Sequence, residues 1–270
     1  MEVLKEYGEI LALYDEIARK RLLPDVLKLD DPQAHDEVLR ELEEAGALSD
    51  EMNTLPLPVR IKAVLNLARG EGAVAMDVGA TLALAEFGLR GYGVVWGDSL
   101  LFGEPDRAYG GGKVGKFVGE RVSVLGLRGL RWWSGRFAAE EDASPEAHLR
   151  LLHYALAAAV GVGLAAYDEA LRYSKERKAF GHPIHDYEEI RRFLNEGRAK
   201  LEASERTLLM ATSEDEIRRA AWQVFDAATF MTEKATQIFG GYGFINEYPV
   251  SKYMRDVRML RSLALPSAYV

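Results

Sequence analysis

Two short segments combine a fixed positive charge, an aromatic ring and paired glycines. Residues 173–184 read Tyr-Ser-Lys-Glu-Arg-Lys-Ala-Phe-Gly-His-Pro-Ile and contain Arg177 and Phe180. A guanidinium offers a planar fork of charged donors that suits a pyrophosphate, and a ring one helical turn later can pack against a flat ligand. Residues 237–244 contain Gln237, Gly240 and Gly241. Glycines at a helix end let a phosphate approach the backbone closely and leave amide groups to donate to it. Each segment alone also fits an ordinary helix end with a basic last turn and a glycine cap.

Other candidate motifs are weaker. Residues 110–116 fit the start of a phosphate-binding P-loop, but Phe117 stands where Ser or Thr would hold magnesium, and no apolar strand precedes the loop. A glycine-rich turn between two strands is the better interpretation. Gly161-Val162-Gly163 lies inside a helical pattern, where glycines permit close helix packing. The chain has no cysteine, its five histidines show no metal-ligand spacing, and the nucleophile motif G-x-S-x-G is absent.

The elements that must position these residues are mostly helices. Apolar residues at spacings of three and four predict N-terminal helices over residues 2–21, 32–45, 59–68 and 74–89. Residues 91–136 are rich in Gly, Val and Trp and predict a few antiparallel strands, too few for a complete barrel. The helical period returns over residues 146–176, 186–211, 215–239 and 249–262, which predicts an antiparallel bundle. The predicted divisions are an N-terminal helical domain at 1–90, a reduced β segment at 91–138 and a C-terminal helical bundle at 139–270.

Composition limits the classes of function. The chain has 270 residues, a formal net charge of −8 and a pI near 5.3, which argues against a nucleic-acid or anionic-membrane partner. The most apolar stretch, residues 151–166, contains a histidine and two glycines and predicts a buried core helix. The first residues lack the basic-then-apolar order of a secretory signal, so we expect a cytoplasmic protein.

From Glu146 to Arg258 the sequence resembles the acyl-CoA dehydrogenase family. The resemblance rests on the two segments above, on the residues around them at 168–172 and 248–250, and on Tyr-Met-Arg-Asp-Val-Arg at 253–258. It implies a mainly helical fold, with N-terminal helices, a reduced β segment and a C-terminal antiparallel four-helix bundle. It implies a flavoprotein that uses FAD to oxidise the CH–CH bond of acyl-CoA thioesters. The residues that would contact the FAD of a neighbouring subunit are Arg177, Phe180, Gln237, Gly240 and Gly241.

The family's catalytic residues are replaced. The glutamate base of the family stands eight residues after the Asp of its Arg-Asp pair, and that position here is Ala264. Some members place the base on the first bundle helix, where this chain has Leu151. Neither side chain can accept a proton. A glutamine that helps to hold FAD in the family is Glu188, a like charge for a phosphate. No catalytic residue is therefore assigned.

Three functions fit this pattern. The first is a subunit that contributes an FAD half-site to a partner, within a homo- or hetero-oligomer of acyl-CoA dehydrogenase-like chains. The second is an active acyl-CoA dehydrogenase with an unrecognised base, and the third is a cofactor-free helical scaffold. Surplus apolar surface on the helix near residues 221–239 predicts the oligomer. The residues that carry this expectation are Trp222, Phe225, Phe230, Met231 and Phe239.

Overall fold

A computed structural model describes residues 2–265, apart from the side chain of Asp50. The N-terminal part is helical, and its bounds are α1 Glu2–Glu6, α2 Gly8–Ile17, α3 Pro32–Glu44, α4 Leu57–Ala68 and α5 Gly72–Glu86. The short turns η1 Ala18–Leu22, η2 Leu23–Asp25, η3 Lys28–Asp30 and η4 Asp50–Thr54 connect them. The predicted start of the second helix is confirmed, because the Asp31 side chain accepts hydrogen bonds from two amides of the first turn of α3.

The next strands form a closed barrel, so the expectation of too few strands for a barrel is wrong. The strands are β1 Gly93–Trp96, β2 Ser99–Leu101, β3 Ala108–Gly110, β4 Lys113–Val122 and β5 Trp132–Asp142, in the order β1-β2-β5-β4-β3. The long β4–β5 ladder runs from the Lys113–Asp142 pair to the Val122–Trp132 pair, and β1 closes the barrel by pairing in parallel with β3. Glycines in the ladder allow this curvature, since a Cβ at Gly115 would lie 2.1 Å from the Ala138 carbonyl oxygen.

The glycine-rich segment at residues 110–116 is a hairpin turn, as the sequence predicts. Gly111 and Gly112 join β3 to β4 and both have positive φ, 58° and 79°. The chain there carries no helix that could follow a P-loop.

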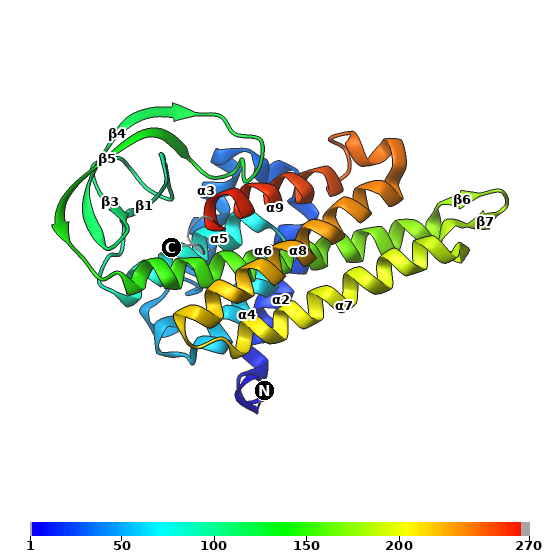
Figure 1. Cartoon of the computed structure of the whole chain (residues 1–270), viewed down its shortest axis with the longest axis horizontal. Helices are drawn as coiled ribbons and strands as arrows, with labels where there is room; N and C mark the ends of the chain where they lie inside the picture. The colour runs from blue at the N-terminus through cyan, green and yellow to red at the C-terminus, as the bar shows by residue number, and fades with distance from the viewer. Residues whose placement is uncertain (1, 266–270) are drawn as a thin grey trace.

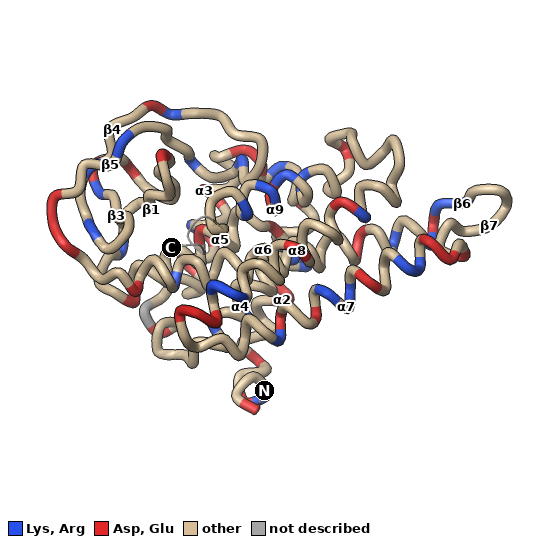
Figure 2. The backbone as a smooth tube through the Cα atoms, in the orientation of Figure 1, with Lys and Arg blue, Asp and Glu red and all other residues tan. Residues whose placement is uncertain are grey.

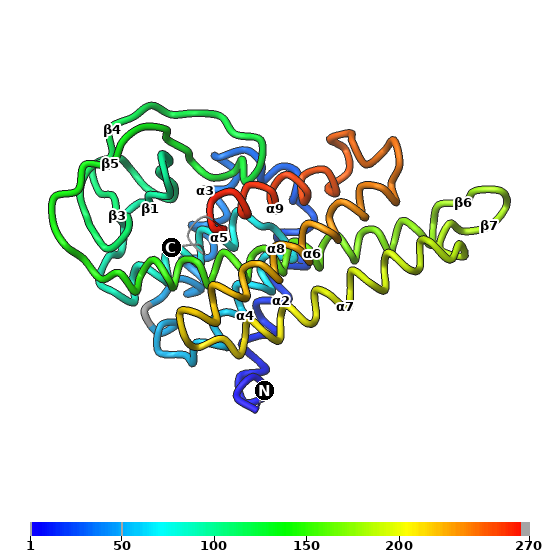
Figure 3. Tube along the Cα trace, in the orientation of Figure 1, coloured from blue at the N-terminus to red at the C-terminus, as the bar shows by residue number. Residues whose placement is uncertain are grey.

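The C-terminal part is the predicted bundle. Its helices are α6 Glu146–Glu176, α7 Glu188–Met210, α8 Glu214–Phe239 and α9 Val250–Ala264. Between them lie a small hairpin of β6 Lys178–Ala179 and β7 His182–Pro183, and the turns η5 Ile184–Asp186 and η6 Gly240–Phe244. Figure 1 shows the barrel at one end of the molecule and the β6–β7 hairpin at the other. The trace in Figure 3 shows α6 running from one end to the other.

Helix α6 is the centre of the hydrophobic core. It is long and apolar enough to cross a membrane, but its most apolar window is 89% buried inside the protein, so it is a core helix as predicted. Gly161 and Gly163 give it close neighbours, since an added Cβ would meet Ala68 of α4 at 2.5 Å and Leu201 of α7 at 2.6 Å. The interpretation of these glycines as packing residues is confirmed.

One prediction about α8 is wrong in part of its basis. Of the five apolar residues expected to form surplus surface on this helix, Phe225, Met231 and Phe239 are buried within the chain, whereas Trp222 is exposed and Phe230 is half-buried. Large apolar side chains are also exposed on the hairpin and on η6, among them Phe180 and Phe244. The oligomer itself stays a prediction.

A buried cluster of charges joins the N-terminal helices to the bundle. Lys252 of α9 is fully buried, and its Nζ lies 2.5 Å from Glu71 Oε1 and 2.6 Å from Asp256 Oδ2. A third carboxylate, Asp30 of η3, lies 3.2 Å away. Asp256 also accepts a hydrogen bond from the backbone N–H of Leu127, which follows the barrel strand β4. Through Lys252 and Asp256, helix α9 therefore contacts η3, the start of α5 and the segment after β4.

Burial shifts the pKa values in this cluster. Burial raises the pKa of Asp256 to about 6, although Lys252 acts in the opposite direction. Burial works against the charged form of Lys252, but Asp256, Glu71 and Asp30 together raise its pKa well above the ordinary value. The lysine therefore stays protonated across the neutral range.

Candidate functional site

The first predicted segment forms the end of α6 and the hairpin that follows. Arg177 caps α6 in an extended conformation, with its N–H donating to the Tyr173 carbonyl oxygen at 2.8 Å. Phe180 and Gly181 form the two-residue turn of the hairpin, with φ of 52° and 87°. Positive φ at both positions matches a hairpin turn whose twist suits the flanking strands, and it is strained for a bulky side chain.

This corrects the expected place of Phe180. It does not lie one helical turn after Arg177, because α6 ends at Glu176 and the chain reverses in the hairpin. The Phe180 side chain is 96% exposed at the tip. The hairpin is held by the Tyr187 hydroxyl, which donates to the Ala179 carbonyl oxygen at 3.0 Å. The hairpin therefore leaves the Phe180 ring exposed at this end of the bundle.

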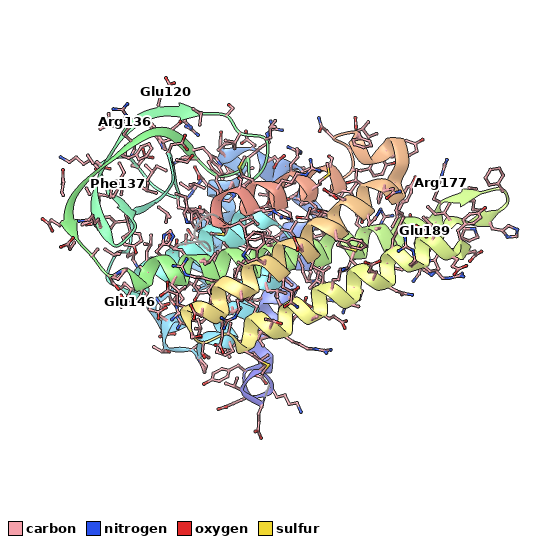
Figure 4. All side chains as sticks on the ribbon, in the orientation of Figure 1. Glu120, Arg136, Phe137, Glu146, Arg177 and Glu189 are labelled. Atoms are coloured by element: carbon pink, nitrogen blue, oxygen red, sulfur yellow. The ribbon has the colours of Figure 1, made fainter. Side chains whose placement is uncertain are left out.

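Arg177 is exposed and its guanidinium is available. Among residues 2–265 no side chain forms a hydrogen bond or ion pair with it, whereas the neighbouring Arg172 is paired with Glu169 and Glu176. Figure 4 labels Arg177 at the far end of α6 from Glu146, where the helix begins. Figure 2 shows that charges of both signs alternate along the nearby helix α7. An unpaired guanidinium at such a place can bind an anion.

The second segment forms the end of α8 and the start of η6. Gly240 caps α8 with φ of 60° and ψ of −131°, which only glycine adopts easily. An added Cβ at Gly240 or Gly241 would have no atom within 4 Å, so this backbone is open to a ligand. One expectation is corrected: the Gly240 N–H is not free, because it bonds to the Gln237 carbonyl oxygen. Gln237 is exposed, and its side-chain oxygen accepts a hydrogen bond from Lys234 at 2.9 Å.

The two segments meet in one cleft of about 430 Å³, called here the distal cleft. Its lining includes Tyr173, Arg177, Phe239, Gly240 and Gly241. The Tyr173 and Phe239 rings stack at 3.9 Å between centroids. The structure thus brings together three of the five predicted contact residues, while Phe180 and Gln237 are not part of its lining.

Tyr173 belongs to this cleft although sequence reasoning did not single it out. It lies one helical turn before Arg177, a spacing that places both on the same side of α6. Burial raises the pKa of the Tyr173 hydroxyl, and Arg177 opposes the shift. A stacked aromatic pair beside an unpaired arginine and an open glycine turn can hold a flat ring and a phosphate together.

A second cleft, called here the barrel cleft, has a volume of about 480 Å³ and lies between the barrel and α9. Its lining includes Trp96, Trp132 and Ser134 from the barrel and Ser262 from α9. The Trp96 Nε1 is buried and has no hydrogen-bond partner among the described residues. No sequence motif marks this cleft, because its walls come from strands and a helix more than 120 positions apart.

The two family base positions are buried and apolar. Leu151 on α6 and Ala264 at the end of α9 are both 0% exposed. Leu263, next to Ala264, lines the barrel cleft. Pro266, which follows in the replaced motif, lies outside the described residues. Across residues 2–265 no three His, Cys, Asp or Glu side chains gather as a metal site would require.

Comparisons with known proteins agree with this architecture. The family model "Acyl-CoA dehydrogenase, C-terminal domain" matches residues 147–264. The chain is 30% identical over 163 residues to cyclohexane-1-carbonyl-CoA dehydrogenase of Geobacter metallireducens, covering 55% of this chain and 43% of that protein. It is 38% identical over 108 residues to subunit CarC of the caffeyl-CoA reductase-Etf complex of Acetobacterium woodii, covering 37% of this chain and 28% of that protein. The matched part is thus less than half the length of either relative.

The structural comparison extends over the whole fold. Butyryl-CoA dehydrogenase of Megasphaera elsdenii matches with a TM-score of 0.74 at 19% identity, over 100% of this chain and 96% of that one. An identity this low establishes the fold alone. The family model, the sequence matches in the bundle and this fold all support a member of the acyl-CoA dehydrogenase family, with the sequence evidence confined to the bundle and its neighbourhood.

Proposed function

We propose that this chain contributes an FAD half-site to a partner subunit and does not itself carry out the family's proton abstraction. The observation that carries the proposal is the distal cleft, where an unpaired Arg177 faces an open Gly240-Gly241 turn beside a stacked aromatic pair. A guanidinium fork pairs well with a pyrophosphate, and exposed glycine backbone permits close approach. Bound FAD would supply the hydride acceptor.

The position of Arg177 supports a shared site. Arg177 lies at the end of α6 away from the barrel (Figure 1), and the 31 residues of this helix span about 45 Å. A pyrophosphate at Arg177 and a flavin ring near the barrel of a second chain would make up one site from two chains. The exposed Phe180 ring at the hairpin tip fits packing against that second chain.

The proposal that proton abstraction is lost rests on Ala264 and Leu151. Both are buried and apolar, and loss of a general base typically costs about 10²–10⁴-fold in rate. Similarity to CarC, a subunit of a complex with Etf, is in keeping with a chain that works beside other subunits. We propose an acyl-CoA dehydrogenase-like chain as the partner, either a second copy or a homologue.

A second function is favoured by one observation. The Asp98 carboxylate lines the barrel cleft, in the turn between β1 and β2. If this carboxylate removed the α-proton of an acyl thioester, while the β-hydride passed to a flavin, the chain would be an active dehydrogenase with a new base. Asp98 accepts a hydrogen bond from the Ser99 hydroxyl at 3.2 Å.

Anaerobic mixing tests both functions. The purified chain, loaded with FAD alone or with a full-length homologue, is mixed with butyryl-, octanoyl- and palmitoyl-CoA, and flavin absorbance is followed. The half-site proposal predicts no bleaching by the chain alone. Rapid bleaching that is lost in Asp98→Asn would establish the second function instead. A chain that binds no flavin in either form would be a cofactor-free scaffold.

A further inference from the structure

A third cleft borders the barrel cleft, with which it shares Val122, Val124 and Trp132, and it is basic. It has a volume of about 720 Å³ and lies between the η3–α3 junction, the end of β4 with the segment that follows, and Arg255 of α9. We call it the basic cleft. Its charged lining consists of Lys28, Asp30, Asp31, Arg121, Arg128 and Arg255. Four cations around one cleft are unexpected in a chain of net charge −8.

The two carboxylates in the lining are already engaged. Asp31 caps α3, where its side chain accepts from the backbone N–H groups of Gln33 and Ala34 at 3.0 and 3.2 Å. Asp30 lies 3.2 Å from the buried Lys252 Nζ, which it shares with Glu71 and Asp256. Asp30 also lies 3.6 Å from Arg255 and 3.8 Å from Arg128, so it offsets part of their charge, whereas no carboxylate among residues 2–265 pairs with Arg121.

The arginines are less engaged. Among residues 2–265 no side chain forms a hydrogen bond or ion pair with the Arg121 guanidinium. Arg128 is about half exposed, and its nearest carboxylate oxygen, on Asp30, is 3.8 Å away. A smaller cleft of about 380 Å³ shares Arg121 and adds Arg40 and Arg131, of which Arg131 is paired with Asp36. Arg121 therefore belongs to both clefts.

The same cleft has an apolar wall. Val122 and Val124 line it, and Leu125 beside them is 77% exposed. A wall of this kind next to arginines suits a ligand with an anionic head and an apolar portion. The volume is within the range of small-molecule sites, and a phosphate has enough oxygens to bond guanidinium groups arriving from different directions.

We propose that the basic cleft binds a phosphate-bearing small molecule with an apolar portion. Arg121 and Arg128 hold the phosphate, and Leu125 packs on the apolar portion. This site is distinct from the half-site, because none of its lining residues lines the distal cleft.

Isothermal titration of the full chain with pyrophosphate and with octyl phosphate tests the proposal. Saturable binding is expected for both probes. The double variant Arg121→Gln/Arg128→Gln should weaken both at least tenfold. Leu125→Ser should weaken octyl phosphate several-fold and leave pyrophosphate within twofold. The matched control Arg136→Gln/Arg206→Gln makes the same charge change at two exposed arginines outside the cleft, and should alter neither affinity more than twofold.

Three results would overturn the proposal. One is the absence of saturable binding of either probe. Another is an equal loss in the control variant, which would show nonspecific attraction by surface charge. The third is loss of binding in Arg177→Ala with retention in the double variant, which would move the anion to the distal cleft. FAD retention is measured in parallel, so failure here is distinguishable from failure of the half-site.

Discussion

Replacing Lys252 with methionine should cost more stability than any other single lysine change in the bundle. The change removes the one buried cation beside Glu71, Asp256 and Asp30, at 2.5, 2.6 and 3.2 Å from its Nζ. Glu71 and Asp256 are 0% and 1% exposed, so water cannot take over the role of the ammonium group.

Breaking a buried ion pair by removing one partner typically costs about 3–5 kcal/mol. Each buried carboxylate keeps one backbone hydrogen bond, Glu71 from Val74 and Asp256 from Leu127, both at 2.6 Å. These bonds offset part of the cost, and methionine fills much of the lysine volume. We therefore expect a loss of about 3–4 kcal/mol, a large share of the roughly 5–15 kcal/mol that stabilises a typical domain.

Urea unfolding at pH 7.5, followed by circular dichroism, measures this loss. Lys200→Met is the control, because Lys200 is exposed and lies 3.5 Å from Glu196, a surface pair of about 0–1 kcal/mol. The deficit of Lys252→Met should shrink at pH 5, since Asp256, whose pKa burial raises to about 6, is then protonated and needs no cation. A loss below about 1 kcal/mol at pH 7.5, or a deficit that grows on acidification, would refute the reasoning.

The remaining predictions concern the same cluster and the distal cleft. The folded-state pKa of Asp256 is raised from 3.8 to about 6, so its contribution is complete below pH 4 and is lost as the pH rises through 6. The stability advantage of the native chain over Asp256→Asn should accordingly fall between pH 4 and pH 7 in urea titrations, and a rise would contradict the pKa direction. Gly243→Ala should destabilise by about 1–3 kcal/mol, because its Cβ would lie 2.3 Å from the Thr236 carbonyl oxygen, whereas Gly241→Ala meets open space and should be nearly neutral in the same assay. Glu188→Gln should tighten FAD binding to the assembled complex about two- to fivefold in equilibrium dialysis, since it removes a like charge near the phosphates; unchanged affinity would place Glu188 away from the cofactor.

Much of the bundle could be predicted from the sequence. Helices α6 to α9 begin and end within a few residues of the predicted bounds, because their apolar residues recur with a helical period and turns separate them. The barrel could not be predicted. Three of its strands, β1 to β3, have four residues or fewer, too short for a period, and closure depends on the parallel pairing of β1 with β3.

The candidate site was partly predictable for a similar reason. Arg177 and the Gly240-Gly241 turn each mark the end of a helix, and helix ends are local features of a sequence. The hairpin that carries Phe180 outward depends on positive φ at a bulky residue, which local preferences disfavour. The bond from the Gly240 N–H to Gln237 and the two clefts near the barrel arise only from the folded chain. The proposed boundaries at residues 90 and 138 stay predictions.

The half-site is tested most directly by the FAD affinity of Arg177 variants. Native chain, Arg177→Ala and Arg177→Lys are each assembled with a full-length homologue, and FAD affinity and melting temperature are measured for the complexes and for each chain alone. A bond between charged groups contributes about 1.5–3 kcal/mol, so Arg177→Ala should weaken FAD binding by the complex roughly ten- to hundredfold. Arg177→Lys should restore only part of this, because it keeps the charge and loses the fork. Melting of the isolated chain should change little, since the guanidinium has no ion pair among the described residues. Unchanged FAD affinity in every combination, or a collapse of folding with no effect on flavin, would contradict the account.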